Sequence, residues 1–320
     1  MSTPEPTEPD DTRAGEGAPA SAIAPERPGT NDDAAAPDAE SAPADSEGDA
    51  GAGGDGGSAS GPGRADLLPS PVFVLLLGIT GLAGWFSWTR AEVDWTGDDS
   101  TVYLPFVFIL FGWIVSLALH EFGHALAAYR FGDRGLRGGG YLRLNPFAYR
   151  GLFAGLLMPV AFLVLGGVGL PGPAPHDPSA VRGRAARSLA ALAGIAVNLL
   201  LAVALAAAVA VLVPADMFTD NWMLVGLMYL CYLNLTAALL NVLPVPGLDG
   251  FAALSPYLPE RVAGLARTWG LFGVIALFAV LWLPQVNLAF LNAMLGLFGA
   301  LGLPQMDIGF GEILFRFWVS

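Results

Sequence analysis

The sequence contains no lysine and a single cysteine, and only 13% of its 320 residues are charged. Cys231 alone cannot form an intrachain disulfide, and the lack of further cysteines excludes a cysteine-rich metal site. The low charge accompanies 54% hydrophobic residues and a mean hydropathy of +0.56. These values exclude an ordinary soluble domain and are typical of a polytopic membrane protein.

The net charge of −13 belongs almost entirely to the N-terminal tail. Residues 1–65 hold 14 acidic residues and 3 arginines, which gives −11, and the rest of the chain carries −2. The tail is rich in Ala, Gly and Pro and shows no apolar periodicity, so we expect residues 1–66 to be disordered. We expect no cleavable signal peptide, because no basic stretch precedes an apolar core there. This local acidity gives no reason to expect a nucleic-acid partner.

Apolar stretches follow the tail and predict an all-α polytopic membrane protein with about six transmembrane helices. They define a membrane-embedded domain over residues 67–303, with an interfacial segment over 304–320. The glycine-rich residues 136–140 and the alternating residues 141–144 predict a short β-hairpin-like stretch. The apolar stretches cover residues 71–88, 102–129, 151–170, 188–213, 222–242 and 269–283, and a further one covers 288–303.

The second apolar stretch contains the pattern His120-Glu121-x-x-His124. In a helix, two histidines four residues apart share one face and can bind one metal ion. Glu121 lies between them, near the place of a metal-activated water. Because ionisable side chains are costly inside a bilayer, the pattern favours a metal site over a chance pair.

A tetrahedral catalytic zinc site needs a third protein ligand. His176 lies in a polar turn among arginines and is interpreted as a surface residue. Asp249 follows an apolar helix that Pro244 and Pro246 end. The residues alone leave two readings of Asp249 open, a metal ligand and a solvated side chain at a helix end.

The distribution of charged residues among the loops predicts a membrane topology. The positive-inside rule places the arginine-rich residues 130–150 in the cytoplasm, together with the active-site side and the N-terminal tail. If residues 151–170 enter the membrane and return, residues 182–187 are also cytoplasmic and the acidic residues 216–220 are outside. A re-entrant segment at residues 151–170 also brings Asp249 to the side of the membrane that holds the two histidines. We therefore predict that residues 151–170 are re-entrant.

The order of these motifs resembles the site-2 protease family of intramembrane zinc metalloproteases, peptidase family M50. The histidine pattern is followed far downstream by Asn241-x-x-Pro244-x-Pro246-x-Leu248-Asp249-Gly250. Residues 193–198 resemble the family's A-G-P-x-x-N motif, and residues 141–146 are similar to a G-R-L-x-L-N-P stretch. The resemblance covers residues 100–255. Ile195 replaces the motif's proline, and Tyr149 stands where one branch often has histidine.

The resemblance implies that Zn²⁺ is held by His120, His124 and Asp249, with Glu121 as general base. It implies a role for Asn198, and for Asn241 near the Asp249 turn, in binding substrate or the developing oxyanion. The implied partners are a transmembrane protein substrate and the lipid bilayer. Residues 141–144 suggest edge pairing with an unwound substrate.

Asn234 lies inside an apolar helix and is interpreted as an interhelical hydrogen-bonding residue.

Two alternative functions are a catalytically silent metal-binding adaptor and an ion transporter. The presence of Glu121 argues against the adaptor, and the lack of internal repeats argues against the transporter.

Overall fold

The computed structural model describes residues 67–89, 103–149, 151–166, 180–213 and 219–318. Within these ranges the chain is all-helical and forms no strand, which confirms the expected class. His176 lies outside the described residues, as does the N-terminal tail, residues 1–66.

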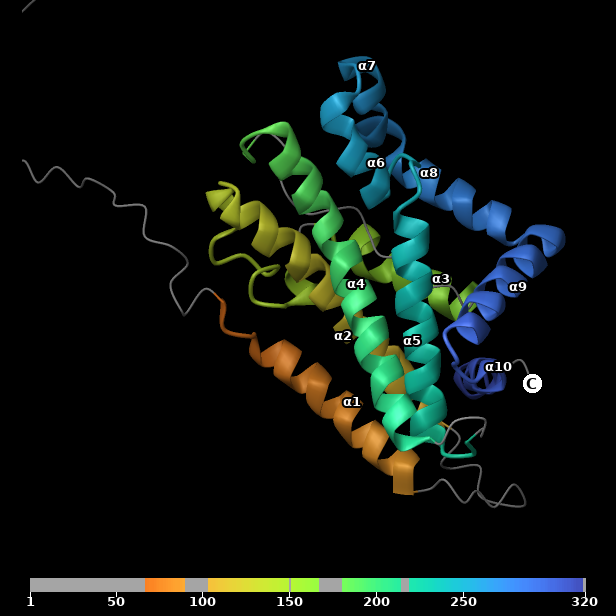
Figure 1. Cartoon of the computed structure of the whole chain (residues 1–320). Coiled ribbons are helices and arrows are strands. Elements are labelled where there is room, and N and C mark those ends of the chain that lie inside the picture. The colour runs from red at the N-terminus through yellow and green to blue at the C-terminus, as the bar shows by residue number, and fades with distance from the viewer. Residues whose placement is uncertain (1–66, 90–102, 150, 167–179, 214–218, 319–320) are drawn as a thin grey trace, which may run out of the picture. The chain divides into compact units, whose positions relative to one another are not determined.

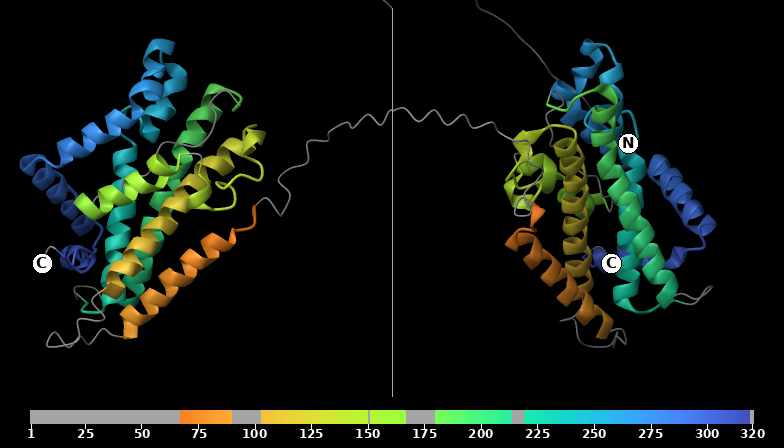
Figure 2. Two further views of the ribbon diagram at one scale, coloured as in Figure 1. Left: turned by 180° about the vertical axis from the view of Figure 1, so that it is seen from behind. Right: turned by 60° about the vertical axis from the view of Figure 1, so that its left-hand side comes forward.

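Four helices are long and apolar enough to cross a membrane, namely α1 (Pro71–Thr89), α2 (Tyr103–Arg130), α4 (Arg184–Leu212) and α5 (Trp222–Asn241). They lie side by side in both sets of views (Figures 1 and 2). In the most apolar part of each helix, 61% of α2 and 78% of α5 is buried, against 28% of α1 and 22% of α4. The helices α2 and α5 therefore form the interior, whereas α1 and α4 keep broad apolar faces that suit lipid.

A bent pair follows these four helices. The axes of α8 (Leu265–Leu281) and α9 (Pro284–Ala300) differ by 86° across a short break. Pro284 opens α9, where its missing N–H costs nothing but prevents α8 from continuing. Counted as one span, the pair raises the number of candidate spans in the described residues to five.

The expectation of about six transmembrane helices was therefore too high for the described part of the chain. One reason is the bend between α8 and α9, which merges two apolar stretches into a single candidate span. The other is α3 (Met158–Gly166), which a π-helical turn (Phe153–Leu157) precedes and which is shorter than the spanning helices. Hydropathy counts apolar residues, but it does not show where a helix breaks.

Short helices complete the described chain. Two of them, α6 (Asp249–Leu254) and α7 (Glu260–Ala263), lie between α5 and α8 with a 3₁₀ turn at Ser255–Tyr257. The last helix, α10 (Gln305–Phe315), packs on α5 and α2 and buries Phe315. The interfacial position of residues 304–320 stays a prediction.

The prediction of a β-hairpin-like stretch at residues 141–144 was wrong. Local turns satisfy this backbone, since the Asn145 N–H donates to the Gly140 carbonyl at 2.8 Å and the Leu144 N–H to the Tyr141 carbonyl at 3.2 Å. Leu144 has a φ of +54°, which no regular strand contains. Tyr141 and Leu142 are both buried although they are adjacent, so the apparent alternation had no structural meaning. Edge pairing of a substrate with these residues has no support.

Candidate metal centre

Helix α2 presents His120 and His124 to the interior of the helical bundle. Both side chains have no exposed surface, and their Nε2 atoms lie 3.0 Å apart. The four-residue spacing puts the rings on one helix face, one turn apart. The chain thus supplies two buried nitrogen ligands from one rigid element.

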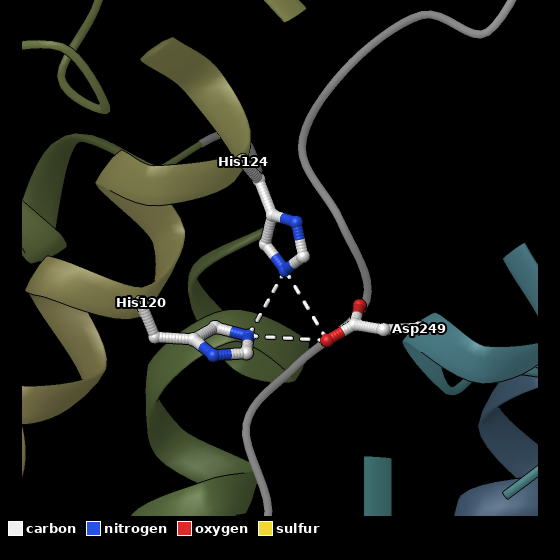
Figure 3. Close-up of side chains that lie close together, drawn as sticks. All are labelled: His120, His124 and Asp249. Atoms are coloured by element: carbon white, nitrogen blue, oxygen red, sulfur yellow. Dashed lines mark hydrogen bonds and ion pairs between the residues drawn. The ribbon is translucent and has the colours of Figure 1, made fainter. Parts of the chain in front are cut away.

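Asp249 supplies the third group from the first residue of α6. Its Oδ2 atom lies 3.4 Å from Nε2 of His120 and 3.2 Å from Nε2 of His124, and the side chain is 1% exposed. Figure 3 shows the three side chains pointing toward one another from two separate elements. Asp249 therefore lies beside the two histidines, as expected, and the side of the membrane on which the site lies stays a prediction.

The three ligand atoms fit a tetrahedral zinc ion. Zinc–ligand bonds of about 2.0–2.1 Å at tetrahedral angles separate neighbouring ligands by about 3.3–3.4 Å. The three separations in this structure are 3.0, 3.2 and 3.4 Å. Three buried groups with lone pairs directed at one point also repel each other, and a cation at that point removes the repulsion. His120, His124 and Asp249 are thus a donor set able to hold one metal ion.

Helix α4 holds this arrangement from the side. Nδ1 of His124 lies 2.8 Å from the Ala190 carbonyl oxygen, which can only accept a hydrogen bond. This bond places the proton on Nδ1 and leaves Nε2 free to bind a metal. One turn further along, Gly194 touches both rings, and a Cβ atom there would overlap Nε2 of His124 and lie 2.6 Å from Cε1 of His120. The hydroxyl of Ser188 donates to the Ala253 carbonyl of α6 at 2.6 Å.

These α4 contacts were not anticipated from the sequence. A signal for them existed in the small residues Ala190, Ala191, Ala193 and Gly194, which permit close approach of two helices. The sequence could not show that the close approach occurs at the histidines.

Glu121 lies on the same turn of α2, but it is not one of the three ligand groups. Its side chain is 1% exposed, and neither carboxylate oxygen has a hydrogen-bond partner among the described residues. An unpartnered buried carboxylate is costly, so this one is available to a water or a substrate group.

Tyr149 lies near Glu121. Its hydroxyl is buried without a hydrogen-bond partner in the described structure, and its ring stacks on Tyr141 with centroids 4.4 Å apart. Burial raises the pKa of Tyr149 well above its usual range, and the charge of Glu121 adds to the rise. The phenol therefore stays protonated and remains a donor.

Comparison with known proteins identifies the family. The chain is 40% identical over 256 residues to "Putative zinc metalloprotease Rip2" of Mycobacterium tuberculosis strain H37Rv, covering 80% of this chain and 96% of the relative. The chain belongs to the site-2 protease family. The same protein of Mycolicibacterium smegmatis is 38% identical over 80% of this chain and 97% of its own length. "Putative zinc metalloprotease YwhC" of Bacillus subtilis is 30% identical over 59% of this chain and 91% of its own length.

No family model matches the chain. No solved structure matches it either. The assignment to the site-2 protease family therefore rests on the curated relatives, and the geometry of the site agrees with it.

The two asparagines expected near a site-2 protease centre occupy different elements. Asn198 lies on α4, one turn beyond Gly194, and Asn241 is the last residue of α5. Both side chains are buried, and all four of their amide atoms lack a partner among the described residues. Asn234 behaves differently, because its amide donates to the Ser116 hydroxyl of α2 at 3.2 Å. The interhelical interpretation of Asn234 is confirmed.

Proposed function

We propose that this chain is an intramembrane zinc metalloprotease that hydrolyses a peptide bond in or near a transmembrane segment of a membrane protein. One observation carries the proposal: three buried ligand atoms lie 3.0–3.4 Å apart beside an unpartnered glutamate, inside helices suited to a bilayer. The zinc metalloprotease names of the relatives support it.

The roles of the residues follow from their chemistry. His120, His124 and Asp249 would hold a zinc ion, which when bound would supply Lewis-acid chemistry for the scissile carbonyl and for the attacking water. Glu121 accepts a proton from that water and transfers it to the leaving amine. The Ala190 carbonyl keeps His124 in the tautomer that leaves Nε2 unprotonated. Asn198 and Asn241 offer unpartnered amide groups to the substrate backbone or the developing oxyanion.

A peptide bond within a transmembrane helix is protected, since its carbonyl is hydrogen-bonded inside the helix. The substrate segment must therefore unwind locally before the carbonyl reaches the site. Free backbone groups of the unwound segment need new partners in a dry environment. Buried amide groups such as those of Asn198 and Asn241 are suited to supply them.

We further propose that the site opens toward the cytoplasm. The Ser70 N–H at the start of α1 donates to the Arg143 carbonyl at 2.8 Å, so the first helix begins at the arginine-rich end of α2. Exposed arginines gather at this end, among them Arg130, Arg134 and Arg143. The positive-inside rule assigns such an end to the cytoplasm.

A catalytically silent metal-binding adaptor is the alternative function. It has no need of Glu121, whose buried carboxylate is costly unless it acts in the chemistry. Nothing in the described structure favours the adaptor over the enzyme.

The proposal is tested by co-expressing a panel of single-span membrane proteins with the wild-type chain or with Glu121→Gln, and by measuring zinc in both purified proteins. The glutamine variant keeps the size of the side chain and all three ligands. We expect cleavage of at least one protein with the wild type only, and zinc in both. Equal cleavage patterns across the panel, with zinc bound in both proteins, would contradict the protease function and favour the metal-binding adaptor.

A further inference from the structure

The turn that carries Asp249 has few backbone hydrogen bonds of its own. It runs from residue 242 to residue 248, and Pro244 and Pro246 lack the N–H groups that could anchor it. Its internal hydrogen bond joins the Leu248 N–H to the Val245 carbonyl at 3.0 Å. Gly247 has a φ of +98°, which favours glycine. Because α6 begins directly at Asp249, any shift of this turn moves the carboxylate.

Helix α8 lies against this turn through two glycines. A methyl group at Gly270 would lie 3.2 Å from the Cα atom of Gly247, and one at Gly273 would overlap the Pro246 carbonyl oxygen. In the opposite direction, a Cβ atom on Gly247 would overlap the Gly270 carbonyl. The two backbones are therefore in direct contact, with no space for an added carbon at Gly273 or Gly247 and little at Gly270.

The remaining packing of α8 keeps this contact in place. Its buried positions form one stripe along the helix, whereas Leu271, Phe272 and Ile275 on other faces are exposed. Within the stripe, Phe278 stacks on Phe162 of α3 with ring centroids 4.1 Å apart. The buried members of the stripe are Gly270, Val274, Phe278 and Leu281. The stripe begins at the turn and ends on α3, so α8 packs against both through its buried face.

We propose that Gly270 and Gly273 are positioning residues that set the place of the Asp249 carboxylate relative to His120 and His124. The inference rests on the proposed metal site. Tetrahedral binding tolerates only small shifts of a ligand, and the ligand atoms now lie within a few tenths of an ångström of the required separations. Helix α8 lies outside residues 100–255, where the family motifs occur, so these glycines extend the site to a part of the chain without a motif.

The test uses Gly273→Ala and Gly270→Ala, with Gly296→Ala of α9 as matched control, because a Cβ atom at Gly296 meets nothing within 4 Å. Alanine is a better helix former than glycine, so a loss of metal affinity in these variants cannot be attributed to a weakened helix. The readouts are zinc affinity by chelator competition in detergent and the visible absorption spectrum of the cobalt-substituted protein. We expect Gly273→Ala to bind zinc about 10- to 100-fold more weakly, as for other supporting residues of metal sites. Gly270→Ala should show a smaller loss, and Gly296→Ala none.

A double variant separates positioning from general damage. In an Asp249→Ala background the carboxylate is absent, so Gly273→Ala should lower zinc affinity no further, whereas general damage would lower it again. Wild-type affinity and spectrum in Gly273→Ala, or an equal loss in both backgrounds, would overturn the inference. If Gly273→Ala does not fold, the same readouts are taken on Gly270→Ala. An unchanged zinc affinity in Gly270→Ala would then overturn the inference. A wild-type chain that binds no zinc would instead refute the proposed function together with this inference.

Discussion

Nδ1 of His124 on α2 lies 2.8 Å from the carbonyl oxygen of Ala190 on α4. This hydrogen bond joins the helix that supplies two ligands to the helix that supplies none. It fixes the ring orientation and the tautomer at once, because the carbonyl accepts only from a protonated Nδ1. One turn further along α4, the missing side chain of Gly194 provides the space that the two rings occupy.

We therefore expect Gly194→Ala to weaken zinc binding strongly. The added methyl group would overlap Nε2 of His124, and the rings would have to turn away from Asp249. Zinc affinity should fall by at least 10- to 100-fold, the range for loss of supporting contacts in metal sites. Zinc content of the purified protein measures the effect. Gly81→Ala in α1, where a Cβ atom meets nothing within 4 Å, is the control and should keep its zinc.

The hydrogen bond between Asn234 of α5 and Ser116 of α2 should stabilise the fold without affecting the chemistry. Asn234→Leu and Ser116→Ala should each lower the free energy of unfolding by about 1 kcal/mol, with a coupling of about 0.6 kcal/mol in the double variant. Unfolding in mixed micelles gives these values. Cleavage and zinc content should not change, and a large loss of either in Ser116→Ala would assign this pair to the active site.

Much of the centre could be predicted from the sequence because its signals are local. The spacing of His120 and His124 follows from helix periodicity, and the cost of Glu121 in an apolar stretch follows from solvation. The place of Asp249 needed one further argument, from loop charges. The structure agrees with that argument in one respect, because Asp249 lies beside the histidines, whereas the orientation in the membrane stays a prediction.

What the sequence could not give was the packing between elements. Gly194 matters because the His120 and His124 side chains lie against it, and the small residues around it do not show which side chains these are. Gly270 and Gly273 matter because a backbone from a distant part of the chain approaches them, and a glycine in an apolar helix has no local signal for that. The alternation at residues 141–144 failed for the opposite reason. A short pattern fits a strand and a series of turns equally well, and the contact of Gly140 with Ala148 selects the turns.

The proposed topology predicts which face of the membrane Ala185 occupies. Ala185 is exposed near the start of α4, and Asp220 is exposed just before α5. With Cys231 replaced by alanine, a membrane-impermeant thiol reagent should label Ala185→Cys only from the cytoplasmic side. Asp220→Cys should be labelled only from outside. Labelling of Ala185→Cys from outside would mean that residues 151–170 cross the membrane completely.

Asp307 of α10 should make stability depend on pH. Burial raises the pKa of this carboxyl above its usual range near 4, although a hydrogen bond from the Thr219 backbone opposes the rise. A raised pKa favours the protonated form in the folded state, so the stabilisation is complete below about pH 4 and is lost as the pH rises through the folded-state pKa.

Asp307→Asn removes this ionisation. We expect the variant to melt at a higher temperature than the wild type at pH 7, and the difference to shrink toward pH 4. Glu312→Gln is the comparison, because Glu312 is partly exposed and pairs with Arg316 at 3.0 Å. A variant of Asp307 that loses more stability at pH 7 than at pH 4 would show that the charged carboxylate is the favoured form.

The most direct test of the central claim is a zinc titration of cleavage with the purified, reconstituted protein and one substrate from the co-expression panel. The protein is stripped with a chelator, and zinc is returned in steps to the wild type, Glu121→Gln and Asp249→Asn. We predict that wild-type cleavage disappears on stripping and returns in full at one zinc per chain. Glu121→Gln should bind one zinc without cleaving, and Asp249→Asn should need far more zinc. Cleavage that survives complete removal of zinc, or that persists in Glu121→Gln, would contradict the account.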